Sequence, residues 1–207
     1  LYEQAMNELA PAAISNDDPR PNLIGLDRED LIALFAELGE KKYRAEQVYR
    51  WIYQHGVTEF ADMTSLSKNL RESLGGQFRI TRPGTSSRQI STDGTRKWLL
   101  RFDDAQEAET VFIPEPDRGT LCVSSQVGCT LTCSFCHTGT QRLVRNLEPG
   151  EIVGQLMTAR DEVGVWPSSA ADRALTNVVM MGMGEPLFNY DNVAKALRIA
   201  MDGDGLS

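Results

Sequence analysis

The spacing of apolar residues changes along the chain and divides it into four stretches. Residues 1–21 contain turn-forming residues without a sustained period, which predicts a loose leader. Residues 22–83 carry apolar side chains three and four positions apart, a pattern typical of short helices. Residues 84–114 alternate with a period of two, as strands do, and residues 115–207 repeat a strand, loop and helix pattern. The sequence therefore predicts a helical accessory domain, a β extension and an α/β domain.

Three helices are expected in the accessory domain. The first follows Asp27, whose carboxylate can cap it, and Gly39 can end it by adopting a left-handed conformation. A second helix is predicted over residues 44–55, and a third over residues 67–74, ended by Gly75. The apolar faces of the first two helices consist of Leu31, Leu34, Phe35, Leu38, Val48, Trp51 and Ile52.

The β extension begins with a predicted hairpin. Residues 88–91 and 95–102 form its strands, and Asp93-Gly94 between them supplies the positive backbone angles of a tight turn. Residues 109–113 should form a third strand. We expect this sheet to join the accessory domain to the α/β domain.

The strand and helix pattern occurs twice in residues 115–207. Strands are expected over residues 120–124 and 178–181, and helices over residues 149–163 and from Tyr190 onward. Repeated units of this kind predict a barrel-type α/β fold with its site at the carboxyl edge of the strands. Because only two units fit, we expect part of a TIM-like barrel.

Composition and charge narrow the class of protein. The chain has no run of eighteen apolar residues and no signal-peptide pattern at its start, so we expect a soluble, cytoplasmic protein. The net charge of -8 hides an asymmetry, because residues 41–101 contain 12 Lys or Arg against 5 Asp or Glu. That region carries +7 and the remainder of the chain therefore carries -15.

A basic module beside an acidic one suits a protein that holds RNA with one part and modifies it with the other. Ordinary solvated charge is the alternative interpretation. The candidates for phosphate contact are Lys41, Lys42, Tyr43, Arg44 and Arg50.

Three of the four cysteines lie on one short loop, where Cys129, Cys133 and Cys136 have the spacing C-x3-C-x2-C. Thiolates are soft ligands that select iron-sulfur clusters, zinc or copper(I), so this crowding indicates a metal site. Three ligands leave one coordination position open for another molecule. A structural zinc ion closed by Cys122 or His137 is the alternative.

This spacing, with Phe135 before the last cysteine, resembles the signature of radical S-adenosylmethionine (SAM) enzymes. Wider blocks of the sequence resemble the RlmN-type dual-specificity RNA adenosine methyltransferases. These blocks are residues 121–129, 133–139, 146–147, 151–152 and 179–187. The likeness runs from about Asn22 to the end of the chain, with its core in residues 109–187.

The resemblance implies two cofactors. The three loop cysteines would bind a 4Fe-4S cluster, whose fourth iron takes the amino and carboxylate groups of SAM. Phe135 would lie against the adenine of SAM, although an aromatic residue here can also pack in the barrel. Gly184 and Glu185, in the stretch Gly-Met-Gly-Glu-Pro, would contact the methionine end of SAM, and an ordinary Gly-Pro turn is the alternative.

The resemblance also assigns catalytic residues. In this family a carrier cysteine near the C-terminus is methylated by one SAM, and a second SAM activates that methyl group for addition to C2 of adenosine. The cysteine matching Cys122 then releases the RNA by forming a disulfide bond with the carrier, and the glutamate matching Glu109 accepts a proton. Without the resemblance, Cys122 would be a small buried side chain in an apolar strand.

No cysteine follows Cys136, so we expect the chain to be an N-terminal portion that is inactive alone. The whole protein is expected to be a monomeric radical SAM methyltransferase acting on 23S rRNA and tRNA, supplied by an electron donor, without membrane association. Methylation of C8 of adenosine, the sister activity, and a non-catalytic zinc-binding RNA module are the alternatives.

Overall fold

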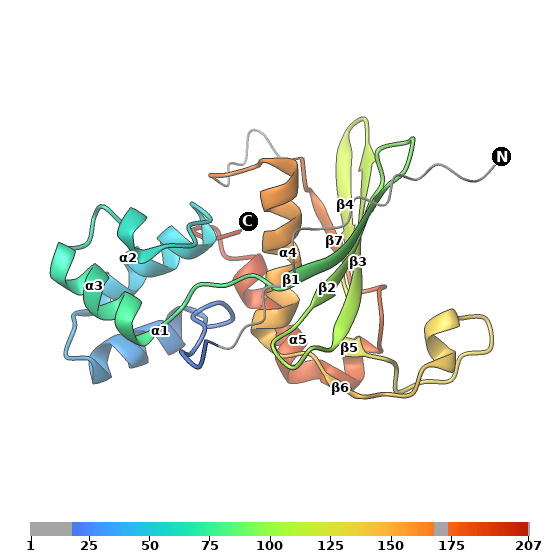
Figure 1. Ribbon diagram of the computed structural model, residues 1–207, viewed down its shortest axis with the longest axis horizontal. Coiled ribbons are helices and arrows are strands. Elements are labelled where there is room, and N and C mark those ends of the chain that lie inside the picture. Colours follow the sequence, from blue (N-terminus) through green and yellow to red (C-terminus); the bar gives the residue numbers. More distant parts are fainter. Residues whose placement is uncertain (1–17, 168–173, 207) are drawn as a thin grey trace.

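The structure, a computed structural model, describes residues 18–167 and 174–206. The predicted leader, residues 1–21, therefore lies almost entirely outside the described residues. The described chain forms three helices at one end, followed by a mixed sheet with two further helices (Figure 1). No helix in these ranges is both long and apolar enough to cross a bilayer.

The helical end consists of α1 (Arg28–Glu37), α2 (Lys42–Tyr53) and α3 (Lys68–Gln77). Asp27 caps α1 as predicted, because its carboxylate accepts the N–H of Asp30 and the Asp30 carboxylate accepts the N–H of Asp27 in return. Ser67 caps α3 through the N–H of Leu70. These capping bonds satisfy N–H groups that the first helical turn leaves without a partner.

The third helix is longer than predicted. Gly75 does not end it, because α3 continues through both glycines to Gln77. The N–H of Phe78 still donates to the carbonyl of Leu74 at 2.8 Å, and the Phe78 ring is buried. Burial of this ring therefore outweighs the weak helix propensity of the glycines. A short helix that the sequence did not indicate, η1 (Phe60–Asp62), precedes α3.

The predicted apolar faces of the first two helices are confirmed at their centres. Leu31, Phe35, Val48 and Ile52 are all buried. Trp51 lies at the edge of the core instead, where its indole N–H donates to the Ser65 hydroxyl at 2.8 Å. The indole thus keeps a polar partner while its rings pack on the core.

Five strands form one mixed sheet in the order β1-β2-β3-β4-β7. The strands are β1 (Gly84–Ile90), β2 (Arg96–Arg101), β3 (Glu107–Glu115), β4 (Arg118–Cys122) and β7 (Asn177–Val179). The first four pair antiparallel, and β4 pairs with β7 in parallel. The hairpin and the third strand are confirmed, with Gly94 at φ 85° in the turn. The domain limits at residues 83 and 114 stay predictions.

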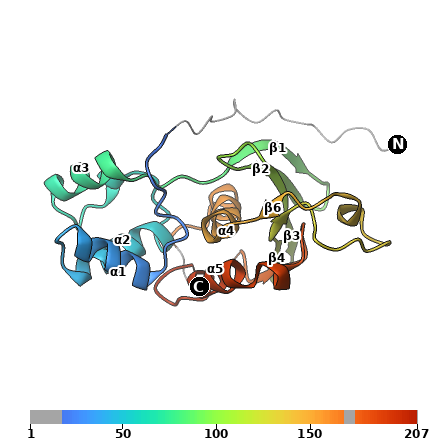
Figure 2. The ribbon, with the colours of Figure 1, turned by 90° about the horizontal axis from the view of Figure 1, so that it is seen from below.

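Helices α4 (Pro149–Val163) and α5 (Tyr190–Ala200) lie side by side on one face of the sheet (Figure 2). Helix α4 has the predicted bounds. The covered face carries the buried side chains of Trp98, Leu100, Ala108, Phe112, Leu121 and Val123. Together β4, α4, β7 and α5 form the two predicted strand and helix units, with parallel strands.

Ion pairs join the helical end to the α/β part. Arg28 of α1 makes two hydrogen bonds to Asp202, at 2.6 and 2.7 Å. Arginines of the basic region also pair with carboxylates of the acidic part or of the sheet: Arg50 with Asp204, Arg79 with Asp103, Arg82 with Asp161, and Arg88 with Glu162. Part of the charge asymmetry therefore holds the chain together and is not available to RNA.

Candidate active site

The cysteine loop, residues 128–144, starts beyond the carboxyl end of β4. It is closed at its base by two short strands, β5 (Gln126–Val127) and β6 (Arg145–Asn146), which pair antiparallel. In both views the loop projects from the end of the molecule opposite to α1–α3 (Figures 1 and 2). The two short strands that close this loop were not predicted from the sequence.

Backbone hydrogen bonds shape this loop around the thiols. The Cys136 N–H donates to the Cys133 carbonyl at 3.1 Å, and the Leu131 N–H donates to Sγ of Cys129 at 3.4 Å. Backbone N–H groups of η2 (His137–Thr140) lower the pKa of the Cys136 thiol, because they stabilise its thiolate. All three cysteines are free and partly exposed.

The chemistry of these donors suits a metal, but their side chains are not gathered into a finished site. Within the described residues, no three His, Cys, Asp or Glu side chains lie close enough together to hold an ion. Thiolates on a partly exposed loop are ligands for an iron-sulfur cluster or for zinc. Binding of either would draw Cys129, Cys133 and Cys136 together, so their role as ligands stays a prediction.

A second loop, residues 182–186, lies against the base of the cysteine loop. The N–H groups of Ser125 and Gln126 both donate to the Met183 carbonyl, at 2.8 and 3.2 Å. We call this segment, Gly-Met-Gly-Glu-Pro, the GMGEP loop. Because β4 and β7 are neighbouring parallel strands, their carboxyl ends bring the two loops together, as predicted.

The strand before the GMGEP loop is shorter than predicted. Strand β7 ends at Val179, two residues before the end of the predicted strand, residues 178–181. The Gly182 N–H donates to the Val123 carbonyl at 3.0 Å, so the chain turns across the end of β4 here. The side chain of Met181 is consequently 79% exposed.

Both glycines of the GMGEP loop allow it to pack closely against residues 123–126, between β4 and the cysteine loop. Gly184 has φ 96°, a conformation that other residues rarely adopt, and a Cβ there would lie 2.5 Å from Cβ of Gln126. A Cβ on Gly182 would lie 2.6 Å from Oγ of Ser124. The fold itself therefore explains these glycines, and the contact of Gly184 with SAM stays a prediction.

Glu185 begins the short helix η3 (Pro186–Asn189). Its carboxylate accepts the Leu187 N–H at 3.2 Å, and its own N–H donates to Oε1 of Gln126 at 3.0 Å. The Phe135 side chain is 91% exposed on the cysteine loop, so it does not pack in the core. The roles of Glu185 and Phe135 in binding SAM stay predictions.

Glu109 of β3 and Cys122 of β4 lie on neighbouring strands. Val111 of β3 is directly opposite Cys122 of β4, which places Glu109 diagonal to Cys122 on the same face of the sheet. This face is opposite to the one that α4 covers. Nζ of Lys97 lies 3.1 Å from Oε1 of Glu109, and burial raises the pKa of the Cys122 thiol.

Two buried polar side chains beside these loops, Gln126 and Asn189, had no role predicted from the sequence. Gln126 contacts both loops, and the Asn189 amide donates to the carbonyls of Ser125 and Leu147, each at 2.8 Å. Single polar residues carry no periodic signal, so the sequence alone did not single them out.

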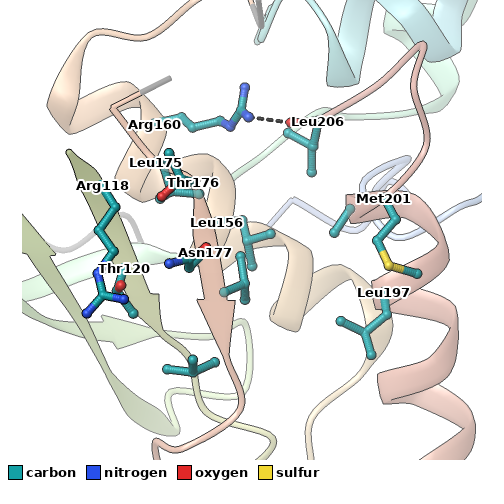
Figure 3. A pocket seen from close by; sticks show the side chains of 13 residues that line it. Arg118, Thr120, Leu156, Arg160, Leu175, Thr176, Asn177, Leu197, Met201 and Leu206 are labelled. Carbon is teal, nitrogen blue, oxygen red and sulfur yellow. Dashed lines mark hydrogen bonds between the residues drawn. The ribbon is translucent and has the colours of Figure 1, made fainter. Parts of the chain in front are cut away.

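A large hollow lies at the other end of the strands. It has a volume of about 670 Å³ and opens between the amino ends of β4 and β7 and the helices α4 and α5 (Figure 3). Its wall includes Leu156, Leu197 and Met201, and Arg160 donates to the Leu206 carbonyl beside it. This hollow is therefore separate from the loops at the carboxyl edge.

Known proteins share both the sequence and the fold. Residues 21–80 match the family described as the ribosomal RNA large subunit methyltransferase N-terminal domain, and residues 123–206 match the radical SAM superfamily. The crystal structure of a radical SAM methyltransferase from Sphaerobacter thermophilus superposes with a TM-score of 0.79 at 40% identity, covering 90% of this chain and 53% of that chain. The chain thus has a partial radical SAM fold, as predicted.

Curated relatives define the family more narrowly. The chain is 57% identical over 202 residues to the dual-specificity RNA methyltransferase RlmN of Gluconobacter oxydans, covering 96% of this chain and 50% of that protein. It is 60% identical over 194 residues to the RlmN of Rhizorhabdus wittichii, covering 92% of this chain and 48% of that protein. Nearly the whole chain is thus similar to the RlmN family of radical SAM proteins, and it spans about half the length of the curated relatives it matches.

Proposed function

We propose that this chain is the cofactor-binding part of a radical SAM enzyme that methylates C2 of an adenosine in 23S rRNA and in tRNA. One observation carries the proposal: the GMGEP loop is hydrogen-bonded to Ser125 and Gln126, at the base of the cysteine loop and at the carboxyl ends of two parallel strands. This edge is where open α/β sheets place their ligands. The names of the relatives, dual-specificity RNA methyltransferases, support the reaction and the substrate class.

In this proposal Cys129, Cys133 and Cys136 hold a 4Fe-4S cluster. Bound there with one iron left open, such a cluster would supply the electron for cleavage of SAM into methionine and a 5'-deoxyadenosyl radical. The chain's own residues orient SAM: Phe135 is exposed beside the third cysteine, and Glu185 presents a carboxylate for the ammonium of SAM. A separate electron donor and a monomeric, cytoplasmic whole protein complete the proposal.

The uncovered face of the sheet holds the groups proposed to act on RNA. The Glu109 carboxylate accepts a proton there, and the Lys97 ammonium at 3.1 Å holds it in place. Cys122 lies diagonal to Glu109 and is the thiol that forms a disulfide bond with a carrier cysteine, as the bond between that carrier and the RNA breaks. Since burial raises the pKa of Cys122, this group stays protonated at neutral pH until its proton is withdrawn.

The start of α2 is the proposed RNA contact. Lys41 is its N-cap residue, Lys42 and Arg44 lie in its first turn, and that turn has neither an acidic residue nor a side-chain cap. Backbone N–H groups and basic side chains at such an end attract phosphate. Arg50 is a weaker candidate, because it is engaged with Asp204 at 3.4 Å.

The test is a product analysis with the full-length protein. It is loaded with iron and sulfide without oxygen, then supplied with a reductant, methyl-labelled SAM, and 23S rRNA or tRNA. The proposal predicts labelled 2-methyladenosine in the digested RNA. Labelled 8-methyladenosine would establish the sister activity instead. If the protein carries a full cluster and the RNA still gains no label, methylation itself would be contradicted.

A further inference from the structure

Gln126 connects the two loops of the candidate active site. Its side chain is fully buried just beyond the carboxyl end of β4. Its Oε1 atom accepts the N–H of Glu185 at 3.0 Å and the N–H of Thr130 at 3.2 Å. Its Nε2 atom donates to Oδ1 of Asn146 at 2.7 Å and to Oγ1 of Thr130 at 2.8 Å. One carboxamide therefore contacts the GMGEP loop, the cysteine loop and β6.

These contacts involve the residues next to the proposed ligands. Thr130 directly follows Cys129, and Glu185 directly follows Gly184. Gly184 lets Gln126 approach, since a Cβ there would lie 2.5 Å from Cβ of Gln126. Because a buried carboxamide is stable only when its donors and acceptors are bonded, the two loops are held in one relative placement.

We propose that Gln126 is a positioning residue that fixes the segment carrying the first cluster ligand relative to the segment that binds SAM. It acts through Thr130 and Glu185. This inference rests on the proposed function, because it concerns the two loops assigned to the cluster and to SAM. Its distinctive consequence is that loss of the carboxamide impairs SAM binding more than it impairs stability.

Gln155 is a matched control within the same chain. Its side chain is also fully buried, and its carboxamide accepts from the Thr110 hydroxyl and the Ser124 N–H, both at 2.8 Å. It also donates to the Ser124 carbonyl at 2.9 Å. These bonds tie α4 to the sheet and do not reach Thr130 or Glu185. Ser124 also contacts the GMGEP loop, because its hydroxyl accepts the Met183 N–H at 2.9 Å. Replacing Gln155 thus removes an equivalent buried carboxamide while the bonds from Gln126 to Thr130 and Glu185 are kept.

The experiment compares Gln126→Leu, Gln126→Glu and Gln155→Leu in the full-length, cluster-loaded protein. Equilibrium dialysis measures the Kd for SAM, thermal unfolding gives the Tm, and hydrogen exchange follows the amides of Thr130 and Glu185. Gln126→Leu should weaken SAM binding by about 10-fold to 100-fold, as loss of a group that orients a ligand typically does. Gln155→Leu should lower the Tm similarly yet leave the Kd within about twofold.

Gln126→Glu keeps an acceptor oxygen for the two N–H groups, so its Kd should lie between those of the wild type and Gln126→Leu. In Gln126→Leu the Thr130 and Glu185 amides should lose protection together, whereas Gln155→Leu should leave both protected. An unchanged Kd in Gln126→Leu, or an equal loss in Gln155→Leu at equal Tm, would overturn the inference.

A failure of the proposed function has a different signature. The wild-type protein would then bind no iron or no SAM, before any variant is compared. The exchange of the two amides still decides whether Gln126 couples the loops, because that readout does not depend on the cofactors. Retained protection of either the Thr130 or the Glu185 amide in Gln126→Leu would contradict the coupling itself.

Discussion

The covered face of the sheet and its carboxyl edge are built on the same strands but differ in what they expose. On the covered face, the large side chains of Trp98, Leu100 and Leu121 are completely buried under α4 and α5. At the carboxyl edge, by contrast, large apolar side chains are left in solvent. They are Phe135, Val144, Met181, Leu187 and Phe188, with Phe135 at 91% and Met181 at 79% exposure.

This difference indicates that the covered face stabilises the fold and that the carboxyl edge serves binding. Apolar groups stabilise a fold only where they are removed from water, so the covered face carries the stability. Clustered exposed apolar side chains mark a surface that binds something else, which here is proposed to be SAM and RNA. Substitutions at the edge should therefore affect binding first, and substitutions on the covered face should affect stability first.

The largest expected effect is the loss of iron from Cys133→Ala. Without one of three ligands the cluster should not assemble, while the Tm should change little because this cysteine is partly exposed. Iron analysis after anaerobic reconstitution measures this. Cys122→Ala is the control, since Cys122 lies in β4 outside the loop, and it should keep its iron. A full iron content in Cys133→Ala would contradict the proposal that the cysteine loop at the carboxyl edge binds the cluster.

A substitution on the covered face should show the reverse. Leu121→Ala removes a fully buried side chain under α4, and it should lower the free energy of unfolding by about 2–5 kcal/mol. Denaturant unfolding measures the loss. The fraction that remains folded should bind SAM with unchanged affinity, and a large change in the Kd for SAM would show that the two regions are not separable.

Gly184→Ala tests the junction between the two loops. The new methyl group adds a clash with Gln126 to the backbone strain of φ 96°. Gly164→Ala is the control, because Gly164 has φ 71° and nothing within 4 Å of the added atom. Gly184→Ala should lower the free energy of unfolding by about 2 kcal/mol more than the control does, as measured by denaturant unfolding. Equal losses would mean that the loops yield easily to the methyl group.

The smallest effect concerns the ion pairs at the helical end. Hydrogen bonds from Arg28 lower the pKa of the Asp202 carboxyl below its ordinary 3.8. This group therefore stabilises the fold above that ordinary pKa, and the stabilisation is lost as the pH falls through the lowered value. Asp202→Asn should lower the Tm by a few degrees at neutral pH, for a loss of about 1 kcal/mol, and match the wild type in strong acid.

The outer Lys68–Glu72 pair, at 3.8 Å and well exposed, supplies the control for this prediction. Glu72→Gln should leave the Tm unchanged across the pH range, because exposed pairs contribute little. If the Tm of Asp202→Asn follows pH in parallel with the Tm of the wild type, Arg28 and Asp202 do not link the helical end to the segment after α5.

Features that depend on local spacing were predictable from the sequence. The bounds of α4, the Asp27 cap and the hairpin turn at Gly94 each rest on residues a few positions apart. The parallel pairing of β4 with β7 followed from the repeated strand and helix pattern. The position of the cysteine loop and the GMGEP loop at the carboxyl edge of the strands likewise followed from this pattern.

Contacts between distant residues were not predictable. Gln126 and Glu185 are 59 positions apart, and Arg82 and Asp161 are 79 apart, so no local period connects them. The charge asymmetry of the sequence was therefore interpreted as an RNA contact or as solvated charge, although part of it joins the helical end to the α/β part. Burial of Phe78 likewise extends α3 through two glycines in a way that helix propensity does not anticipate.

The most direct test of the central claim is the electron paramagnetic resonance spectrum of the reduced, iron-loaded full-length protein with and without SAM. Three cysteine ligands leave one iron open, so the spectrum should be that of a reduced 4Fe-4S cluster and should change when SAM is added. A spectrum that SAM leaves unchanged, or a colourless protein that holds zinc, would contradict the account.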